Sequence, residues 1–113
     1  MLKFNTDGSF EFVRGDNLRI PMAFTSASVA TNLTGYAFKA QIREKPNTGV
    51  LVEFVVELTN LAGGLVAFTA DDSVTKLIRV EEAFWDVQWT TPSGFVETIV
   101  GPAQVTIIKD ITL

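Results

Sequence analysis

Carboxylates are the side chains of this sequence best suited to acid–base chemistry, and several of them occur in pairs. Asp71-Asp72 and Glu81-Glu82 are adjacent acids. Acid pairs can bind Ca²⁺, which takes about six to eight oxygen ligands. Neither pair lies in the spaced acidic loop of a calcium-binding hand, and neighbouring side chains of an extended chain point apart. We therefore interpret the first pair as the start of a helical turn and the second as a solvated loop, and we predict no metal site.

Asp86 is the acid whose surroundings come closest to those of a catalytic group, because Phe84, Trp85 and Val87 flank it. A glycosidase needs two carboxylates that face each other across a cleft, whereas an alternating strand would place Asp86 on its solvated face. We favour the second interpretation. The chain contains no histidine and no cysteine, which are the usual general base and thiolate nucleophile. It contains neither a glycine-rich phosphate loop nor a nucleophile elbow, so we predict a protein that is not an enzyme and has no cofactor.

Arg14-Gly15-Asp16 spells a tripeptide that some cell-adhesion receptors bind. The same residues also make a good turn, because glycine adopts backbone conformations that other residues resist. The side chain of Asp16 or Asn17 can in addition accept hydrogen bonds from nearby backbone amides. We favour the turn over the adhesive interpretation.

The overall charge and hydropathy restrict the kind of partner. The 113 residues, enough for one domain over 1–113, include 9 Lys and Arg and 13 Asp and Glu, a net charge of −4. No basic cluster is present to neutralise a phosphate backbone, so we expect no nucleic-acid partner. No secretory leader and no apolar run of about 20 residues is found, so we expect no membrane partner. The sequence is 47% hydrophobic, which either a phenylalanine-rich core or an outer surface covered by a partner would explain.

Alternation of apolar and polar residues predicts β-strands, because successive side chains of a strand point to opposite faces. In 18–25 and in 36–43 every second residue is apolar, and turn residues flank both runs. Pro21 lacks an amide hydrogen, so its strand should lie at a sheet edge or carry a bulge. The expected strands are 9–13, 18–25, 36–44, 50–58, 64–69, 84–91, 95–100 and 103–109, with a loop over 26–32 and a break at 101–102.

Short strands at spacings of roughly 8–12 residues are typical of a sandwich of two sheets. Val74, Leu77 and Ile78 have helical spacing and follow acids suited to a helix start, which predicts a helical turn crossing between the sheets. The predicted fold class is all-β: an Ig-like antiparallel β-sandwich of about 7–9 strands with one short helical turn, as a single domain.

Trp85 and Trp89 share one face of the expected strand 84–91, and the sandwich pattern places that face at or near the core. If they were exposed, the same two rings and Tyr36 would form a platform on which sugar rings could stack. The sequence leaves open whether Trp85 and Trp89 belong to the core or face a ligand.

The order of the turn and strand motifs resembles that of small β-sandwich modules of tailed-phage virions. The motifs are V-R-G-D at 13–16, N-L-T-G-Y at 32–36, F-K-A-Q-I-R at 38–43, D-V-Q-W-T at 86–90 and G-F-V-E-T-I-V-G-P-A-Q-V-T at 94–106. They are similar to the N-terminal domain of phage baseplate upper proteins and of related tail or fibre-attachment proteins, over about residues 12–105. Phe84-Trp85 stands where tyrosine is common in those modules. The resemblance implies a structural, non-catalytic role and assigns no residue to a site.

We therefore expect a phage virion structural protein, made in the host cytoplasm and assembled through its sandwich surface into the baseplate, tail or fibre-attachment region. Its partners would be other virion structural proteins or further copies of itself, as a homo-oligomer or part of a larger assembly. Outward-facing apolar side chains would supply the contacts, and the interface candidates are Leu51, Val55, Phe95 and Ile99. A capsid decoration protein and a carbohydrate- or host-surface-binding module are the alternatives.

Overall fold

The strands follow the alternation of apolar and polar residues. The computed structural model describes residues 3–5, 8–26, 28–45 and 48–109. Buried residues alternate with more exposed ones along β2 and β3, as expected for strands with one face in a core. The strands are β1 (Lys3–Phe4), β2 (Phe10–Val13), β3 (Leu18–Ala23), β4 (Thr25–Ser26), β5 (Val29–Ala30), β6 (Ala37–Arg43), β7 (Val50–Glu53), β8 (Val55–Asn60), β9 (Leu65–Ala70), β10 (Glu82–Thr90) and β11 (Val96–Ile108).

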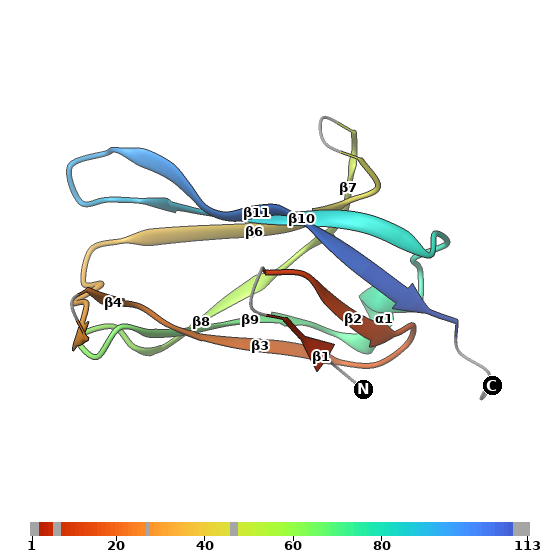
Figure 1. Cartoon of the computed structure of the whole chain (residues 1–113), viewed down its shortest axis with the longest axis horizontal. Helices are drawn as coiled ribbons and strands as arrows, with labels where there is room; N and C mark the ends of the chain where they lie inside the picture. The colour runs from red at the N-terminus through yellow and green to blue at the C-terminus, as the bar shows by residue number, and fades with distance from the viewer. Residues whose placement is uncertain (1–2, 6–7, 27, 46–47, 110–113) are drawn as a thin grey trace.

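Two sheets pack face to face as a sandwich (Figure 1). Sheet A has the order β1-β2-β11-β10-β6-β7, sheet B has the order β3-β9-β8, and β4 and β5 form a small hairpin. The pairs are antiparallel except that β2 runs parallel to β11. The six strands of sheet A oppose the three strands of sheet B, and two facing sheets of this kind are the architecture of Ig-like sandwiches. The predicted Ig-like β-sandwich is therefore confirmed, with one parallel pair added to it.

The segment 50–58 was predicted as one strand, and this was wrong. It divides at Phe54 into β7 of sheet A and β8 of sheet B, so the chain changes sheets there (Figure 1). The Phe54 amide donates to the Ala40 carbonyl at 2.9 Å, and the Phe54 side chain is buried in the core. Of the alternating apolar residues of this segment, Val52 and Phe54 are buried and Val56 packs against the core. Val50 and Leu58, at the two ends of the segment, are exposed.

Two further boundaries differ from expectation. The break predicted at 101–102 is absent, since β11 continues through the cis peptide Gly101-Pro102 and keeps its pairing with β10 across register shifts. Gly101 has a φ of +87°, and a Cβ there would overlap the Trp85 carbonyl, so glycine lets the strand pass through this bulge. The loop expected over 26–32 instead contains β5 and part of β4.

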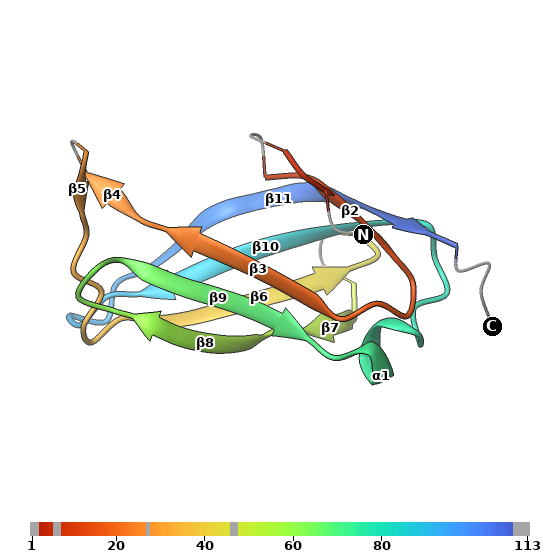
Figure 2. The same ribbon diagram turned by 90° about the horizontal axis from the view of Figure 1, so that it is seen from below.

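The edge position of β3 and the crossing helical turn agree with the sequence. β3 pairs only with β9, so Pro21 lies on an edge strand as predicted. The helix α1 (Asp72–Thr75) connects β9 of sheet B to β10 of sheet A (Figure 2). Within the helix the buried residue is Thr75. Of the predicted apolar residues, Ile78 is buried as expected, whereas Val74 and Leu77 are exposed.

Trp85 of β10 is at the centre of the core. Its side chain is only 1% exposed, and its indole Nε1 donates to the Gly8 carbonyl at 2.7 Å. The Phe10 ring meets the indole edge-on at a centroid distance of 5.1 Å, and the Phe54 ring does so at 5.8 Å. The indole of β10 therefore joins β2 near the N-terminus to the sheet crossing at Phe54, and it satisfies its polar atom inside the protein.

Replacement of Trp85 should lower stability more than any surface change. We expect Trp85→Ala to reduce the free energy of unfolding by about 3–5 kcal/mol, because it removes a large buried ring and leaves a cavity. Trp85→Phe should cause a smaller loss, since it removes mainly the bond to Gly8. Urea denaturation measures both, with the exposed Leu77→Ala as a control expected within about 0.5 kcal/mol of the parent. Equal stabilities of the three variants would contradict this account of the core.

Candidate interaction surface

The structure places the four predicted interface residues on different parts of the surface. Leu51 lies on the edge strand β7, at a register irregularity, and Val55 begins the edge strand β8. Phe95 lies in the turn between β10 and β11 and is 62% exposed. Ile99 of β11 is half-buried and packs against the core, so it offers less surface than the other three. Leu51 and Val55 flank the sheet crossing at Phe54, whereas Phe95 lies near one end of the long axis.

Backbone hydrogen bonds hold together the loops at that end of the sandwich. The β4–β5 hairpin, the β8–β9 turn and the β10–β11 turn all lie there (Figures 1 and 2). The Phe24 amide donates to the Gly64 carbonyl at 2.8 Å, and the Leu33 amide donates to the Leu61 carbonyl at 2.7 Å. The Thr31 amide donates to the Phe24 carbonyl at 2.9 Å. The loops are therefore extensions of the framework with defined conformations.

An aromatic cluster packs behind these loops. The Trp89 ring lies 5.0 Å from the Tyr36 ring, 5.7 Å from the Phe24 ring and 6.4 Å from the Phe38 ring, measured between centroids. The indole Nε1 of Trp89 donates to Glu97 Oε1 at 3.1 Å. Trp89 and Tyr36 are half-buried and Trp85 is buried, so these rings do not form the exposed sugar platform of the alternative hypothesis. Both tryptophans belong to the core or its margin.

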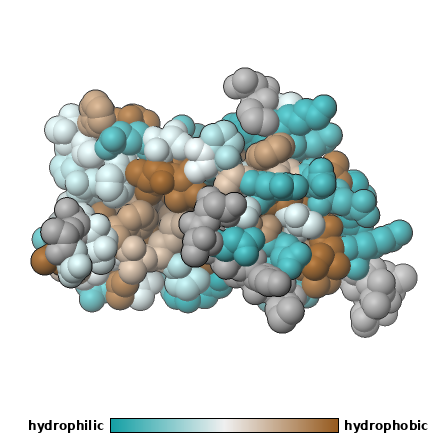
Figure 3. Space-filling view, viewed as in Figure 1, coloured by the Kyte–Doolittle hydropathy of each residue, from teal (hydrophilic) through white to brown (hydrophobic). Residues whose placement is uncertain are grey.

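Charged residues are absent from the loops at this end. The segments 24–36, 58–66 and 89–96 contain no Asp, Glu, Lys or Arg, although the chain has 22 such residues, the 9 basic and 13 acidic ones together. We call these three segments the neutral end. In Figure 3, which has the view of Figure 1, most of the strongly hydrophilic surface lies over the opposite half of the molecule. The exposed large apolar side chains of the neutral end are Val29, Leu58, Leu65, Phe95 and Val96.

The sequence-based candidates captured only Phe95 of this surface. The signal that marks the rest can be read in the sequence as long gaps between charges. No charged residue occurs between Arg19 and Lys39, between Glu57 and Asp71, or between Asp86 and Glu97. Each gap by itself resembles an ordinary buried strand with its turn. Only the fold brings the middle of all three gaps to one end of the molecule.

A shallow apolar hollow of about 210 Å³ opens beside the neutral end on the outer face of sheet B. Pro21, Ala23, Thr59 and Leu65 contribute to its lining, and Arg19 lies at its border. Ala23 and Leu65 pair in the register of β3 and β9, next to the Phe24–Gly64 hydrogen bond. The hollow is therefore continuous with the hairpin that carries Val29.

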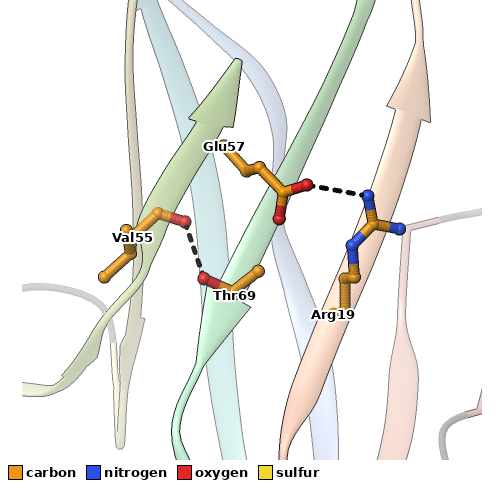
Figure 4. Close-up of polar contacts among 4 residues, drawn as sticks. All are labelled: Arg19, Val55, Glu57 and Thr69. Atoms are coloured by element: carbon orange, nitrogen blue, oxygen red, sulfur yellow. Dashed lines mark hydrogen bonds and ion pairs between the residues drawn. The ribbon is translucent and has the colours of Figure 1, made fainter. Parts of the chain in front are cut away.

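One ion pair spans the outer face of sheet B. Arg19 Nη2 of β3 lies 3.1 Å from Glu57 Oε1 of β8, on either side of β9 (Figure 4). Ala67 of β9 pairs with both Pro21 and Glu57 and is fully buried, although its chain neighbours Val66 and Phe68 point into the core. The Arg19 and Glu57 side chains, which meet over β9, explain why Ala67 is buried on the outer face of the sheet. Both side chains are about half exposed, so the pair itself should contribute no more than about 1 kcal/mol to stability.

The Arg14-Gly15-Asp16 tripeptide forms the turn between β2 and β3, as favoured from the sequence. Gly15 has a φ of +92°, and the Asp16 amide donates to the Val13 carbonyl at 3.1 Å. This turn also holds α1. Asn17 Oδ1 accepts from the Asp72 amide at 2.7 Å, and the Asp16 carbonyl accepts from Thr75 Oγ1 at 2.8 Å.

Asp71 is the residue at the N-cap of α1, but its side chain does not cap the helix. Asn17, which is distant in sequence, accepts the first helical amide instead. The Asp71 carboxylate accepts from Ser73 Oγ at 3.1 Å, and hydrogen bonding with the side chains of Asp72 and Ser73 lowers the pKa of this carboxyl. Within the described ranges, no three acidic side chains gather closely enough to hold a metal ion.

Asp86 lies on the outer side of sheet A, between the buried Trp85 and Val87, as the alternation predicted. In the register of the sheet, Gln41 stands between Asp86 and Glu53. No helix among the residues that the structure describes is long and apolar enough to span a membrane.

Comparison with known proteins identifies no family for this chain. No protein-family model matches the chain, and no curated protein matches it. Among solved structures, the chain is similar to that of murine CRIg, with 12% identity, 97% of each chain covered and a TM-score of 0.44. A likeness this distant carries no information about function.

Asn17 should stabilise the protein more than Asp71 does, although Asp71 occupies the N-cap. We expect Asn17→Ala to lower the free energy of unfolding by about 1 kcal/mol, because the Asp72 amide loses its acceptor. Asp71→Ala should cost no more than about 0.5 kcal/mol. Denaturant melts of the two variants decide between them, and the reverse order would show that Asp71 caps the helix.

Gly64 and Gly94 form a matched pair that tests how tightly the neutral end is built. Both have positive φ, +73° and +91°, but a Cβ at Gly94 would meet no atom within 4 Å. A Cβ at Gly64 would lie 2.8 Å from the Thr31 carbonyl oxygen and would overlap that of Phe24. We expect Gly94→Ala to cost about 1–2 kcal/mol and Gly64→Ala clearly more. Thermal melts compare the stabilities of the two variants. Equal losses of stability would mean that the backbone around Gly64 moves easily to accommodate a Cβ.

Proposed function

We propose that this protein is a non-catalytic structural protein of a tailed-phage virion that assembles through its surface into the baseplate, tail or fibre-attachment region. The observation that carries the proposal is the neutral end, where exposed apolar side chains stand on loops without charged residues. The cores of protein interfaces are depleted of charged residues in the same way. Such a surface is suited to contact with another macromolecule.

The sequence resemblance supports the virion context. The motifs that carry it coincide with structural junctions of the sandwich: 13–16 forms the β2–β3 turn, 32–36 leads into β6, and 86–90 ends β10. The motif 32–36 and the end of 86–90 belong to the neutral end or adjoin it, whereas the β2–β3 turn lies at the end that carries α1. Attachment to a capsid surface would use the same kind of contact, so the location within the particle separates this variant from the tail proposal.

The test is to locate the chain in purified particles. Cells that encode it are induced, particles are purified by density gradient, and their proteins are quantified by mass spectrometry. We expect the chain in the particle fraction in several copies per particle. Immunogold labelling should then place it at the tail or its tip, whereas label over the capsid would replace the tail proposal with capsid decoration. Absence of the chain from intact particles would refute a virion role.

A further inference from the structure

We propose that the neutral end is a self-association surface, through which two copies of this chain meet end to end. The proposal names a surface and a partner for the proposed function, and it rests on that function for its place in a virion. The contact itself is a property of the isolated chain. It can therefore be tested separately from the location in a particle.

Charge favours this end over the rest of the surface for contact between two copies. Each copy has a net charge of −4, so two copies repel each other on average. Segments 24–36, 58–66 and 89–96 carry no charge, and the carboxylate that adjoins them, Glu97, already accepts from Trp89 Nε1 at 3.1 Å. Copies that face each other through these segments therefore place no ionised side chains of the segments themselves in the contact. Ionised groups further along the sandwich are screened over a Debye length of about 8 Å at physiological salt.

The exposed apolar side chains supply the attraction. Val29 of β5 is 67% exposed, Phe95 is 62% exposed and Val96 is 58% exposed, and they come from two different hairpins. Their burial against a second copy would remove apolar surface from water. The residues around them are largely Ser, Thr, Asn and Gly, which serve as adaptable hydrogen-bonding residues in binding loops.

The neutral end is also pre-organised. The hydrogen bonds from Phe24 to Gly64 and from Leu33 to Leu61 fix the loops before association, which reduces the entropy lost on binding. A two-fold interface uses the same patch on both copies, so that patch must contain both protruding and receding parts. Val29 is 67% exposed, and the hollow lined by Ala23, Leu65 and the ion-paired Arg19 offers a recess beside the hairpin.

The size of the end predicts a weak dimer. The molecule measures 43 × 27 × 24 Å, so its end has a cross-section of about 650 Å². A standard stable interface buries about 800 Å² per partner, so contact through this end alone falls below it. We expect micromolar to millimolar dissociation constants in solution. Copies fixed close together in a particle would reach the effective concentration that such a contact needs.

Sedimentation equilibrium of the purified chain over a wide concentration range tests the proposal. We expect a monomer–dimer equilibrium that persists or strengthens as salt is raised, because the contact is apolar. Val29→Asp and Phe95→Asp should each weaken dimerisation by roughly tenfold or more, since a buried unpaired charge is costly. Leu77→Asp is the matched control, because Leu77 is 65% exposed next to α1 at the opposite end and receives the same charge. It should leave the dimer unchanged.

The chain has no cysteine, so single-cysteine variants place the contact directly. Ser93→Cys lies in the neutral end and should give covalent dimers with a bifunctional maleimide, whereas Lys76→Cys near α1 should not. A monomer at every concentration overturns the proposal, even if the chain is found in particles. A dimer that Val55→Asp disrupts while Phe95→Asp does not also overturns it, since the contact would then use the edge of β8. Circular dichroism confirms that each variant is folded.

Discussion

The burial of Trp85 between the two sheets is the interaction on which the rest of the structure depends. The indole contacts Phe10 near one end of the sequence and Phe54 at the sheet crossing, and it donates to the carbonyl of Gly8. These partners come from segments far apart in the chain. The packing of one ring therefore fixes the position of β2 beside β11 and the point at which β7 gives way to β8. A side chain with this many distant contacts forms them only when both sheets are in place.

The core continues from Trp85 along the sandwich and changes character at the neutral end. Around Trp85 the side chains are fully buried, whereas the second aromatic cluster of Phe24, Tyr36, Phe38 and Trp89 is half-buried. This cluster supports the loops from behind, and backbone hydrogen bonds join the loops to one another. The buried core and the exposed neutral loops thus occupy different parts of the long axis. One part of the molecule holds the fold, and the other displays uncharged loops on it.

The opposite end uses polar contacts. There Asn17 and the backbone of Asp16 hold α1 against the β2–β3 turn, and the exposed acids of the helical turn lie nearby. The Arg-Gly-Asp tripeptide therefore forms a turn in this protein, since Gly15 supplies the positive φ that the turn requires. The two ends of the molecule therefore differ in the charge of the turns that close them. Solvated ion-bearing turns close one end, and neutral hairpins close the other.

The sequence by itself determined the fold class, the core faces of most strands and the crossing helical turn, and it restricted the Pro21 strand to a sheet edge or a bulge. These follow from local rules, because alternation and turn residues act over a few neighbouring positions. It did not reveal the division of 50–58 at Phe54 or the continuation of β11 through Gly101-Pro102. Both depend on backbone partners, the Ala40 carbonyl and the strand β10, that lie far away in sequence.

The candidate surface shows the same limit. Phe95 was identified as an outward-facing apolar residue of the expected strand 95–100, and the gaps between charges can also be read from the sequence. Only the tertiary structure decided that Val29, Phe95 and Val96 share one end while Leu51 and Val55 lie along an edge and Ile99 packs on the core. The physical reason is that a surface is assembled from non-local loops. The sequence contains the residues of this surface, but strand pairing within each sheet and the packing of the two sheets bring them to one end of the molecule.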